Sequence, residues 1–243
     1  MNERTDLLIG ETNRQKISIS LFVLSGLGGV GGTALEVLAR FGAEHLFLID
    51  GDTFEESNLN RQILSTKDSI GSLKTETAKK RILSINPNAD VGIFSKRVNK
   101  NNISELIENI SAFKIALELK SNHNLKVFYI DAIDDVKAKC LLYKTFLDNF
   151  DATIISSMGA GRNFYSPLEV TSLPLTHTCP LAKAVRIEAK KHLTVDEMNK
   201  ITAIFGTEKT ASKPQDGILP SSITQTFNMG LTLARTTIEK ALE

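Results

Sequence analysis

The sequence is poor in the features that mark specialised protein classes. Among its 243 residues two are cysteines and none is tryptophan, and 29 basic side chains balance 28 acidic ones, which leaves a net charge of +1. Two cysteines are too few for a disulfide scaffold or a four-cysteine zinc site. The balanced charge gives no global basic field that would attract nucleic acid. The longest apolar runs are only a few residues, and the first six residues lack the layout of a secretory signal, so we expect a cytoplasmic protein without a membrane segment.

Strand-like and helix-like segments alternate along the first two-thirds of the chain. The expected strands span residues 17–24, 45–50, 91–94, 126–132 and 152–156. The expected helices between them span residues 33–40, 73–85, 103–119 and 136–146. This alternation indicates βαβ units, and therefore an α/β fold with a doubly wound, mostly parallel, Rossmann-like sheet.

The alternation is lost beyond residue 157. A basic helix at 181–191, a strand at 201–205 and a final helix at 222–242 are expected there, without a linker-like segment before them. We therefore predict a Rossmann-type domain over 1–160 and an α+β extension over 161–243 that packs on the same sheet.

A glycine-rich turn follows the first expected strand and opens the first helix. It contains Gly26, Gly28, Gly29 and Gly31. Such glycines let backbone N–H groups approach a phosphate at the N-terminus of a helix. Asp50 ends the second strand, where a carboxylate can accept hydrogen bonds from ribose hydroxyls. Nucleotide binding is therefore predicted, although a nicotinamide-dependent oxidoreductase would show the same two features.

The segments beyond Asp50 distinguish between these alternatives. Arg61 and Lys74 follow the second strand, and an acidic cluster at 131–135 follows the strand at 126–132. Such cations are expected in a site where the phosphates of a nucleotide undergo substitution, because negative charge must be stabilised as pyrophosphate leaves. Taken singly, Asp134 fits a helix N-cap, Arg61 a surface ion pair and Lys74 a solvated residue. Their order along the chain favours one shared site, in which the acidic cluster could hold Mg²⁺.

These motifs together resemble the ubiquitin-activating-enzyme-like adenylyltransferases, the ThiF- and MoeB-type superfamily. The matching segments are residues 26–31, 50–52, 57–62, 74, 85–87 and 131–134. Within the superfamily the sequence is most similar to the tRNA threonylcarbamoyladenosine dehydratase branch. That likeness rests on residues 4–11, 156–161, 180–186, 205–209 and 230–234, and it extends over nearly the whole chain.

The resemblance implies ATP and Mg²⁺ as cofactors and a role for each matching residue. The implied nucleotide-binding residues are Gly26, Gly28, Gly29 and Gly31 along the triphosphate, Asp50 and Asp52 at the ribose, and Asn58, Arg61 and Lys74 at the phosphates. The implied catalytic residues are Arg61, Lys74 and Asp134. Asp134, rather than Asp131, matches the acid associated with Mg²⁺. Arg4 matches an arginine that reaches into the nucleotide site of the other subunit, so a homodimer is expected.

The implied reaction begins with attack of a carboxylate on the α-phosphate of ATP. In the dehydratase branch this carboxylate belongs to the threonylcarbamoyl group on adenosine 37 of tRNA, whose carbamoyl group then closes a ring and expels AMP. Because the second step is intramolecular, no protein nucleophile is required. The alternative is adenylation of the C-terminal Gly-Gly carboxylate of a small sulfur-carrier protein, and sulfur-transfer proteins are candidate partners. A catalytically silent binding module is a third hypothesis.

The cysteines depart from the carrier-activating members of the superfamily. No Cys-x-x-Cys pair is present, so no zinc is expected. Cys140 fits a small core residue of a helix. Cys179 precedes Pro180 in an expected loop, where it could be exposed, and no activating base is identifiable near it.

One basic stripe bears on tRNA binding. Lys183, Arg186 and Lys190 are spaced i, i+3 and i+7 along the expected helix at 181–191, so they share one helix face. Such a stripe can bind phosphates through counterion release, and it is equally typical of a solvated face.

Overall fold

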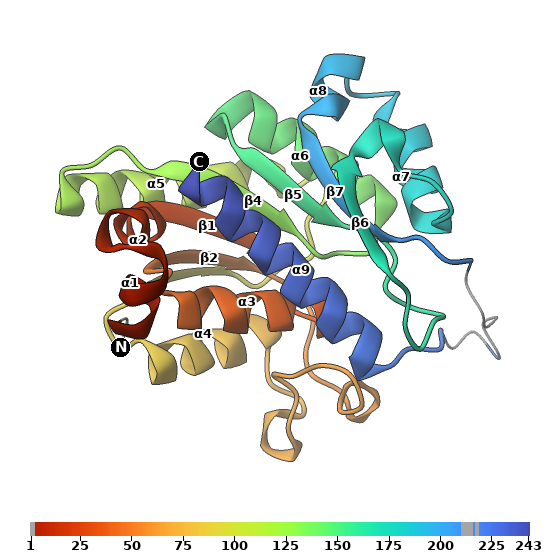
Figure 1. Ribbon diagram of the computed structural model, residues 1–243, viewed down its shortest axis with the longest axis horizontal. Coiled ribbons are helices and arrows are strands. Elements are labelled where there is room, and N and C mark those ends of the chain that lie inside the picture. The colour runs from red at the N-terminus through yellow and green to blue at the C-terminus, as the bar shows by residue number, and fades with distance from the viewer. Residues whose placement is uncertain (1–2, 210–215, 217–218) are drawn as a thin grey trace.

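A seven-stranded sheet runs through the protein, as the computed structural model shows for residues 3–209, 216 and 219–243 (Figure 1). The strand order is β3-β2-β1-β4-β5-β7-β6, and every pair is parallel except β6 with β7. The strands are β1 (Ser20–Ser25), β2 (His45–Ile49), β3 (Asp90–Phe94), β4 (Lys126–Asp131), β5 (Thr153–Ser157), β6 (Leu168–Ser172) and β7 (Ile201–Gly206). The structure confirms the predicted α/β class with a mostly parallel sheet.

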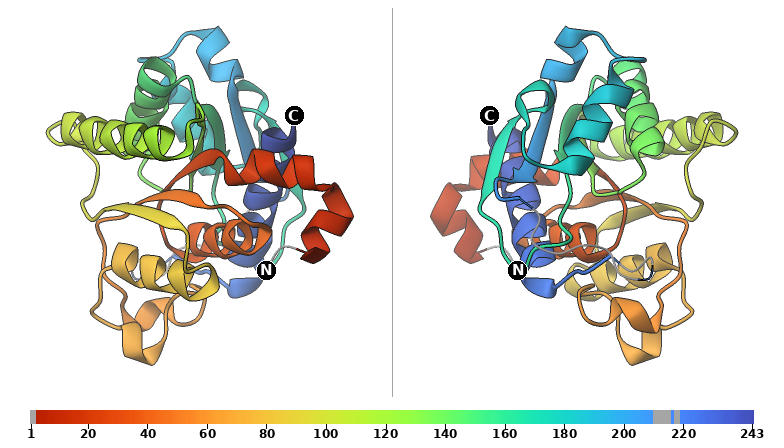
Figure 2. Two further views of the ribbon diagram at one scale, coloured as in Figure 1. Left: turned by 90° about the vertical axis from the view of Figure 1, so that its left-hand side faces the viewer. Right: turned by 90° about the vertical axis from the view of Figure 1, so that its right-hand side faces the viewer.

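Helices cover both faces of this sheet. They are α1 (Glu3–Ile9), α2 (Glu11–Ser18), α3 (Gly29–Phe41), α4 (Lys74–Ile85), α5 (Ile103–Ser121), α6 (Val136–Phe150), α7 (Pro180–Ala189), α8 (Val195–Asn199) and α9 (Ile223–Leu242). Figures 1 and 2 show α3, α4 and α9 on one face and α5, α6 and α7 on the other. None of the helices in the described ranges is long and apolar enough to cross a bilayer.

Strand β1 shows why its sequence forms a central strand. All six of its residues are buried. Leu21 and Val23 belong to the core beneath α5 and α6, whereas Phe22 and Leu24 belong to the core beneath α3 and α9. A continuous apolar run is what a strand with two covered faces requires.

The strand order creates a crevice beside β1. Strand β1 pairs with β2 on one side and with β4 on the other. The helix after β1, α3, covers one face of the sheet, and the helix after β4, α6, covers the other. The loops that leave β1 and β4 therefore diverge at their carboxyl ends, and α/β proteins bind ligands at such a switch point.

The structure corrects the sequence prediction in two places. The strand predicted to begin at residue 17 begins at Ser20, because residues up to Ser18 form the end of α2. The predicted extension does more than pack on the sheet, because it contributes two strands to it. Strand β7 matches the strand predicted at 201–205, whereas the antiparallel edge strand β6 was not predicted. Strand β6 has no buried residue, and its sequence lacks the continuous apolar run that marks the central strand β1.

Candidate nucleotide-binding site

The glycine turn between β1 and α3 is shaped by close backbone packing. Gly26 has φ +84°, and a Cβ there would lie 2.7 Å from the carbonyl carbon and oxygen of Ala132. A Cβ on Gly31 would lie 1.7 Å from the carbonyl oxygen of Gly26. Both positions thus require glycine. The turn ends at Gly28, the N-cap of α3, where no side chain of the described residues caps the helix, so its first N–H groups are left for a ligand or water.

The other two glycines of the turn differ from each other. A Cβ on Gly29 would lie 2.7 Å from the carbonyl oxygen of Arg61 and 2.9 Å from Cβ of Thr226 in α9. A Cβ on Gly28 would meet nothing closer than Gln62 Nε2, at 3.6 Å. Among these four glycines, Gly28 is therefore the one at which a Cβ would make only an ordinary van der Waals contact. That the four glycines line a triphosphate stays a prediction.

Asp50 is tied to the glycine turn from the end of β2. Its Oδ2 accepts a hydrogen bond from the N–H of Leu27 at 2.7 Å, and its Oδ1 accepts one from the N–H of Asp52 at 2.8 Å. Burial raises the pKa of Asp50, against the lowering effects of Lys74 and of these two hydrogen bonds. Each oxygen keeps acceptor capacity, so the carboxylate can also accept from a sugar hydroxyl.

Asp52 binds two cations, one on each carboxylate oxygen. Lys74, the first residue of α4 and itself buried, places Nζ 3.2 Å from Oδ2. Arg97 places both Nε and Nη2 2.8 Å from Oδ1. Burial raises the pKa of Asp52, but Lys74 and then Arg97 outweigh it and hold the pKa below its usual value. The sequence prediction missed Arg97, whose only signal was its place shortly after β3.

Asn58 and Arg61 lie in the loop after β2 and bond within it. Asn58 is buried in a short 3-10 helix (Glu56–Asn58), where its Oδ1 accepts from the N–H of Glu55 at 3.2 Å. Arg61 donates from Nη1 to the carbonyl oxygen of Ser57 at 2.6 Å and to Asn60 Oδ1 at 2.9 Å. The structure brings Asp50, Asp52 and Lys74 together, whereas Arg61 bonds to its own loop. Phosphate contacts of Asn58 and Arg61 stay predictions.

Gln62 is a further residue of this loop that the prediction gave no role. It is 7% exposed, its Nε2 faces Gly28, and its Oε1 has no partner among the described residues. Unsatisfied buried polar atoms are rare in folded proteins. Its place in the matching segment 57–62 was the signal that could have found it.

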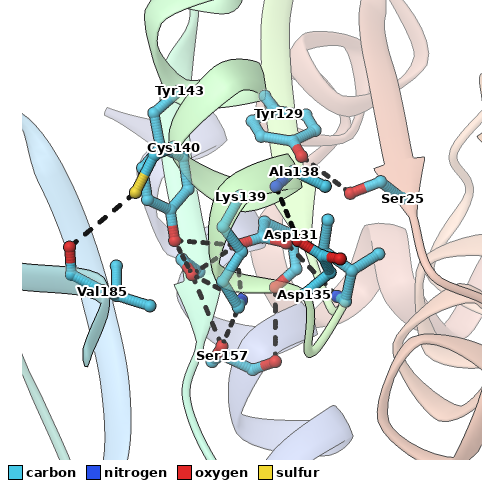
Figure 3. A network of polar contacts seen from close by, with 12 residues as sticks. Ser25, Tyr129, Asp131, Asp135, Ala138, Lys139, Cys140, Tyr143, Ser157 and Val185 are labelled. Carbon is cyan, nitrogen blue, oxygen red and sulfur yellow. Dashed lines mark hydrogen bonds and ion pairs between the residues drawn. The ribbon is translucent and has the colours of Figure 1, made fainter. Parts of the chain in front are cut away.

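The carboxyl end of β4 carries a buried network (Figure 3). Asp131 is fully buried, and its Oδ2 accepts from Lys139 Nζ at 2.6 Å, Tyr143 OH at 2.8 Å and Ser156 Oγ at 2.6 Å. Lys139 also donates to the carbonyl oxygen of Ser157 at 2.9 Å. Burial raises the pKa of Tyr143 well above its ordinary value. These contacts enclose Asp131, which makes it unsuitable as a metal ligand.

Asp134 and Asp135 are both exposed, whereas Asp131 is buried. Asp135, not Asp134, caps helix α6, since its Oδ1 accepts from the N–H of Ala138 at 2.9 Å. The structure thus gives the capping role to a neighbour and leaves the Asp134 carboxylate on the surface beside the β1–β4 crevice.

The two cysteines are both free and buried. Cys140 is the core residue that was predicted, and burial raises its pKa to about 12. The prediction that Cys179 could be exposed is wrong, because this side chain is only 8% exposed. Pro180 begins α7 instead of extending a loop, which makes Cys179 the N-cap. Its Sγ would lie 3.3 Å from a Cβ on Gly159. Within the described residues, no three or more His, Cys, Asp or Glu side chains come together in a way that could hold a metal ion.

Two predicted surface features lie apart from the glycine turn in sequence. Arg4 is exposed on α1, a helix without a buried residue, on which Leu7 and Leu8 are 83% and 79% exposed. In the predicted basic stripe, Lys183 and Lys190 are exposed, but Arg186 is half-buried and donates to Thr176 Oγ1. The stripe therefore contributes fewer free cations than its spacing predicts.

Comparison with known families supports the predicted resemblance. The profile of the ThiF family matches residues 3–163, about two-thirds of the chain. The chain belongs to the ThiF family. The Bacillus subtilis (strain 168) tRNA threonylcarbamoyladenosine dehydratase is 32% identical over 190 residues, which cover 77% of this chain and 68% of that protein. The Escherichia coli (strain K12) protein of the same name is 29% identical over 217 residues, which cover 88% and 75%.

Solved structures extend this ThiF-family likeness to the whole chain. The Escherichia coli tRNA N6-threonylcarbamoyladenosine dehydratase superposes with a TM-score of 0.82 at 26% identity, over 99% of this chain and 93% of that one. Structures of that enzyme with AMP and with ATP match equally well, with TM-scores of 0.83 and 0.82. The likeness therefore includes the part of the chain beyond the ThiF match.

Proposed function

We propose that this chain is an ATP-dependent tRNA threonylcarbamoyladenosine dehydratase. The observation that carries the proposal is the likeness over 99% of the chain to a dehydratase whose structures contain ATP and AMP. The glycine turn after β1, together with Asp50, Asp52 and Lys74 after the neighbouring strand β2, supplies the nucleotide site that this activity needs.

In the first step, the carboxylate of the threonylcarbamoyl group attacks the α-phosphate of ATP, and pyrophosphate leaves. The N–H groups at the start of α3 face the phosphates, and Asp50 accepts from the ribose. Lys74, with Arg61 once it turns from its own loop, stabilises the negative charge that develops.

Mg²⁺ fits the residues beside this crevice. In nucleotide sites this ion takes one or two carboxylates together with phosphate oxygens. Asp134 offers one exposed carboxylate that is used neither as a cap nor in the buried network. Asp134 would hold the ion, which would supply further positive charge to the phosphates.

In the second step, the neighbouring carbamoyl group attacks the acyl-adenylate and AMP leaves, so the nucleoside loses one water in total. Both reacting groups belong to the same nucleoside, and proximity therefore supplies much of the rate. A thiol nucleophile is unnecessary, in agreement with a Cys140 pKa of about 12.

Several finer points belong to the same proposal. The chain would act as a homodimer, in which Arg4 reaches the nucleotide of the other subunit and the exposed Leu7 and Leu8 are covered. The division into an adenylation domain over 1–160 and an acceptor-binding extension over 161–243 stays a prediction. So do a cytoplasmic location and sulfur-transfer partners.

Adenylation of a sulfur-carrier protein is the weaker alternative. Relatives that activate carriers match a smaller part of the chain: the Haloferax volcanii SAMP-activating enzyme E1 matches 41% of it, against 77% and 88% for the two bacterial dehydratases.

The decisive experiment supplies ATP, Mg²⁺ and tRNA bearing threonylcarbamoyladenosine. Nucleoside mass spectrometry should show the loss of one water together with AMP release. A parallel reaction replaces the tRNA with a small carrier protein ending in Gly-Gly. An unchanged nucleoside mass with AMP formation that depends on the carrier would refute the proposal and establish the alternative.

A further inference from the structure

Arg97 lies at the nucleotide site although no motif led to it. It follows β3, whose carboxyl end lies at the same edge of the sheet as those of β1, β2 and β4. Its backbone passes directly over the Asp50–Asp52 segment, since a Cβ on Gly51 would lie 2.2 Å from the backbone nitrogen of Arg97. Its position is thus fixed relative to the two carboxylates at the end of β2.

The guanidinium of Arg97 and the ammonium of Lys74 divide the Asp52 carboxylate between them. Arg97 uses Nε and Nη2 on Oδ1, and Lys74 uses Nζ on Oδ2. Because each cation has its own oxygen, either one can leave without displacing the other. The hydrogen bond and charge of Asp52 raise the pKa of Arg97, and the charges of Asp50 and Asp134 add to this effect.

In the proposed function Lys74 changes partner when ATP binds. Its Nζ is paired with Asp52 in the structure, whereas in the proposed reaction it contacts phosphate. Its departure would leave Asp52, whose side chain is 37% exposed, without a partner on Oδ2. A partly buried carboxylate that loses its counter-ion is destabilised, and this opposes nucleotide binding.

We propose that Arg97 is a positioning residue. It stays paired with the Asp52 carboxylate when Lys74 moves from Asp52 to the phosphates of ATP, and so makes Lys74 available to the phosphates. This inference rests on the ATP binding of the proposed function. Arg97 itself does not contact the reacting atoms. Its contribution appears in the affinity for ATP, because it lowers the free energy needed to separate Lys74 from Asp52.

The test is a double-mutant cycle on ATP binding, measured by calorimetric titration with Mg²⁺ and without tRNA. Arg97→Gln should weaken ATP binding about fivefold, a size typical of a charged hydrogen bond discounted for its exposure. In a Lys74→Met background no ammonium has to leave Asp52, so Arg97→Gln should then change the affinity by less than about twofold.

Lys96→Gln is the matched control. Lys96 is the neighbouring exposed cation, and it pairs with Glu105 on α5 instead of with Asp52. Its substitution should leave ATP affinity within about twofold, because loss of one surface ion pair has little effect. Arg97→Gln removes an exposed side chain, and an unchanged melting temperature would show that the fold is intact.

The outcomes separate this inference from the proposed function. Equal weakening by Arg97→Gln in both backgrounds would mean that Arg97 acts on the nucleotide directly, and it would overturn the exchange. If Lys96→Gln weakens ATP binding as much as Arg97→Gln does, the loss comes from general electrostatics, and the proposed exchange is overturned as well. If ATP binds and the cycle is non-additive while the nucleoside mass stays unchanged, the role of Arg97 stands and the tRNA activity fails. A wild-type chain that does not bind ATP would refute both.

Discussion

Two carboxylate–cation clusters lie at the carboxyl edge of the same sheet, and they differ in their access to solvent. At the end of β4, Asp131 and Lys139 are fully buried, and the contacts of Asp131 are completed by tyrosine and serine hydroxyls. After β2, Asp52 is 37% exposed and divides its oxygens between Lys74 and Arg97. The buried Asp131–Lys139 pair is closed off from ligands, whereas the more exposed pairs of Asp52 after β2 can exchange partners with a ligand. The first cluster therefore suits a structural role and the second a binding role.

The largest effect is expected from breaking the buried cluster. Lys139→Met would leave Asp131 buried and unpaired, which should lower the free energy of unfolding by about 3–5 kcal/mol. Urea denaturation measures this change. The double variant Lys139→Met with Asp131→Asn removes both charges and should recover most of the loss. If the single variant is as stable as the wild type, the pair is not structural.

The next largest effect is expected in the reaction rate, from the cluster after β2. Lys74→Met should lower the rate of AMP release with modified tRNA by about 10²-fold, because a charge that stabilises the transition state is lost. Lys80→Met, on the exposed face of the same helix, is the matched control. AMP release at the wild-type rate in Lys74→Met would remove Lys74 from the site.

A smaller effect is expected in the pH dependence of stability. The pKa of Asp52 is lowered in the folded state, so its ionised form stabilises the fold above the unfolded pKa, and this stability is lost as the pH falls through the folded pKa. The pKa of Asp50 is raised, mainly by burial, so its ionised form destabilises the fold and protonation at low pH relieves this.

These signs are tested by measuring the free energy of unfolding of the wild type and of each variant at pH 7 and at pH 4. The difference between wild type and variant is then compared at the two pH values. On acidification the stability of the wild type relative to Asp52→Asn should fall, by no more than about 1 kcal/mol for so exposed a group. Relative to Asp50→Asn it should rise. Equal slopes for the two variants would contradict the opposite environments assigned to these carboxylates.

The smallest effect is expected from the cysteine outside both clusters. Cys179→Ala should leave the dehydration rate within about twofold of the wild type, because an intramolecular ring closure needs no protein nucleophile. Product formation by nucleoside mass spectrometry measures it. A variant that forms AMP but no cyclised nucleoside would show that the thiol takes part.

The same difference between the clusters explains how far the sequence could predict them. The glycine turn and Asp50 are local features whose spacing alone indicates a nucleotide site, and the alternation of strands and helices predicted the sheet. Arg97 could not be found in this way, because it meets Asp52 across 45 residues of sequence. Nothing in the sequence distinguishes Lys139 from an exposed helix lysine, because its hydrogen-bond partners Ser156 and Ser157 lie on the next strand. Side chains that act through tertiary contacts carry no periodic signal.

Helix α9 has a consequence for the evolution and engineering of this chain. Its Thr226 donates to the carbonyl oxygen of Arg61 at 3.1 Å, and a Cβ on its Gly230 would lie 2.4 Å from the carbonyl oxygen of Val30. Helix α9, near the end of the sequence, thus packs against the glycine turn that follows β1 near its beginning. Residues 1–160 could therefore not be separated from α9 without exposing the surface of the glycine turn against which that helix packs.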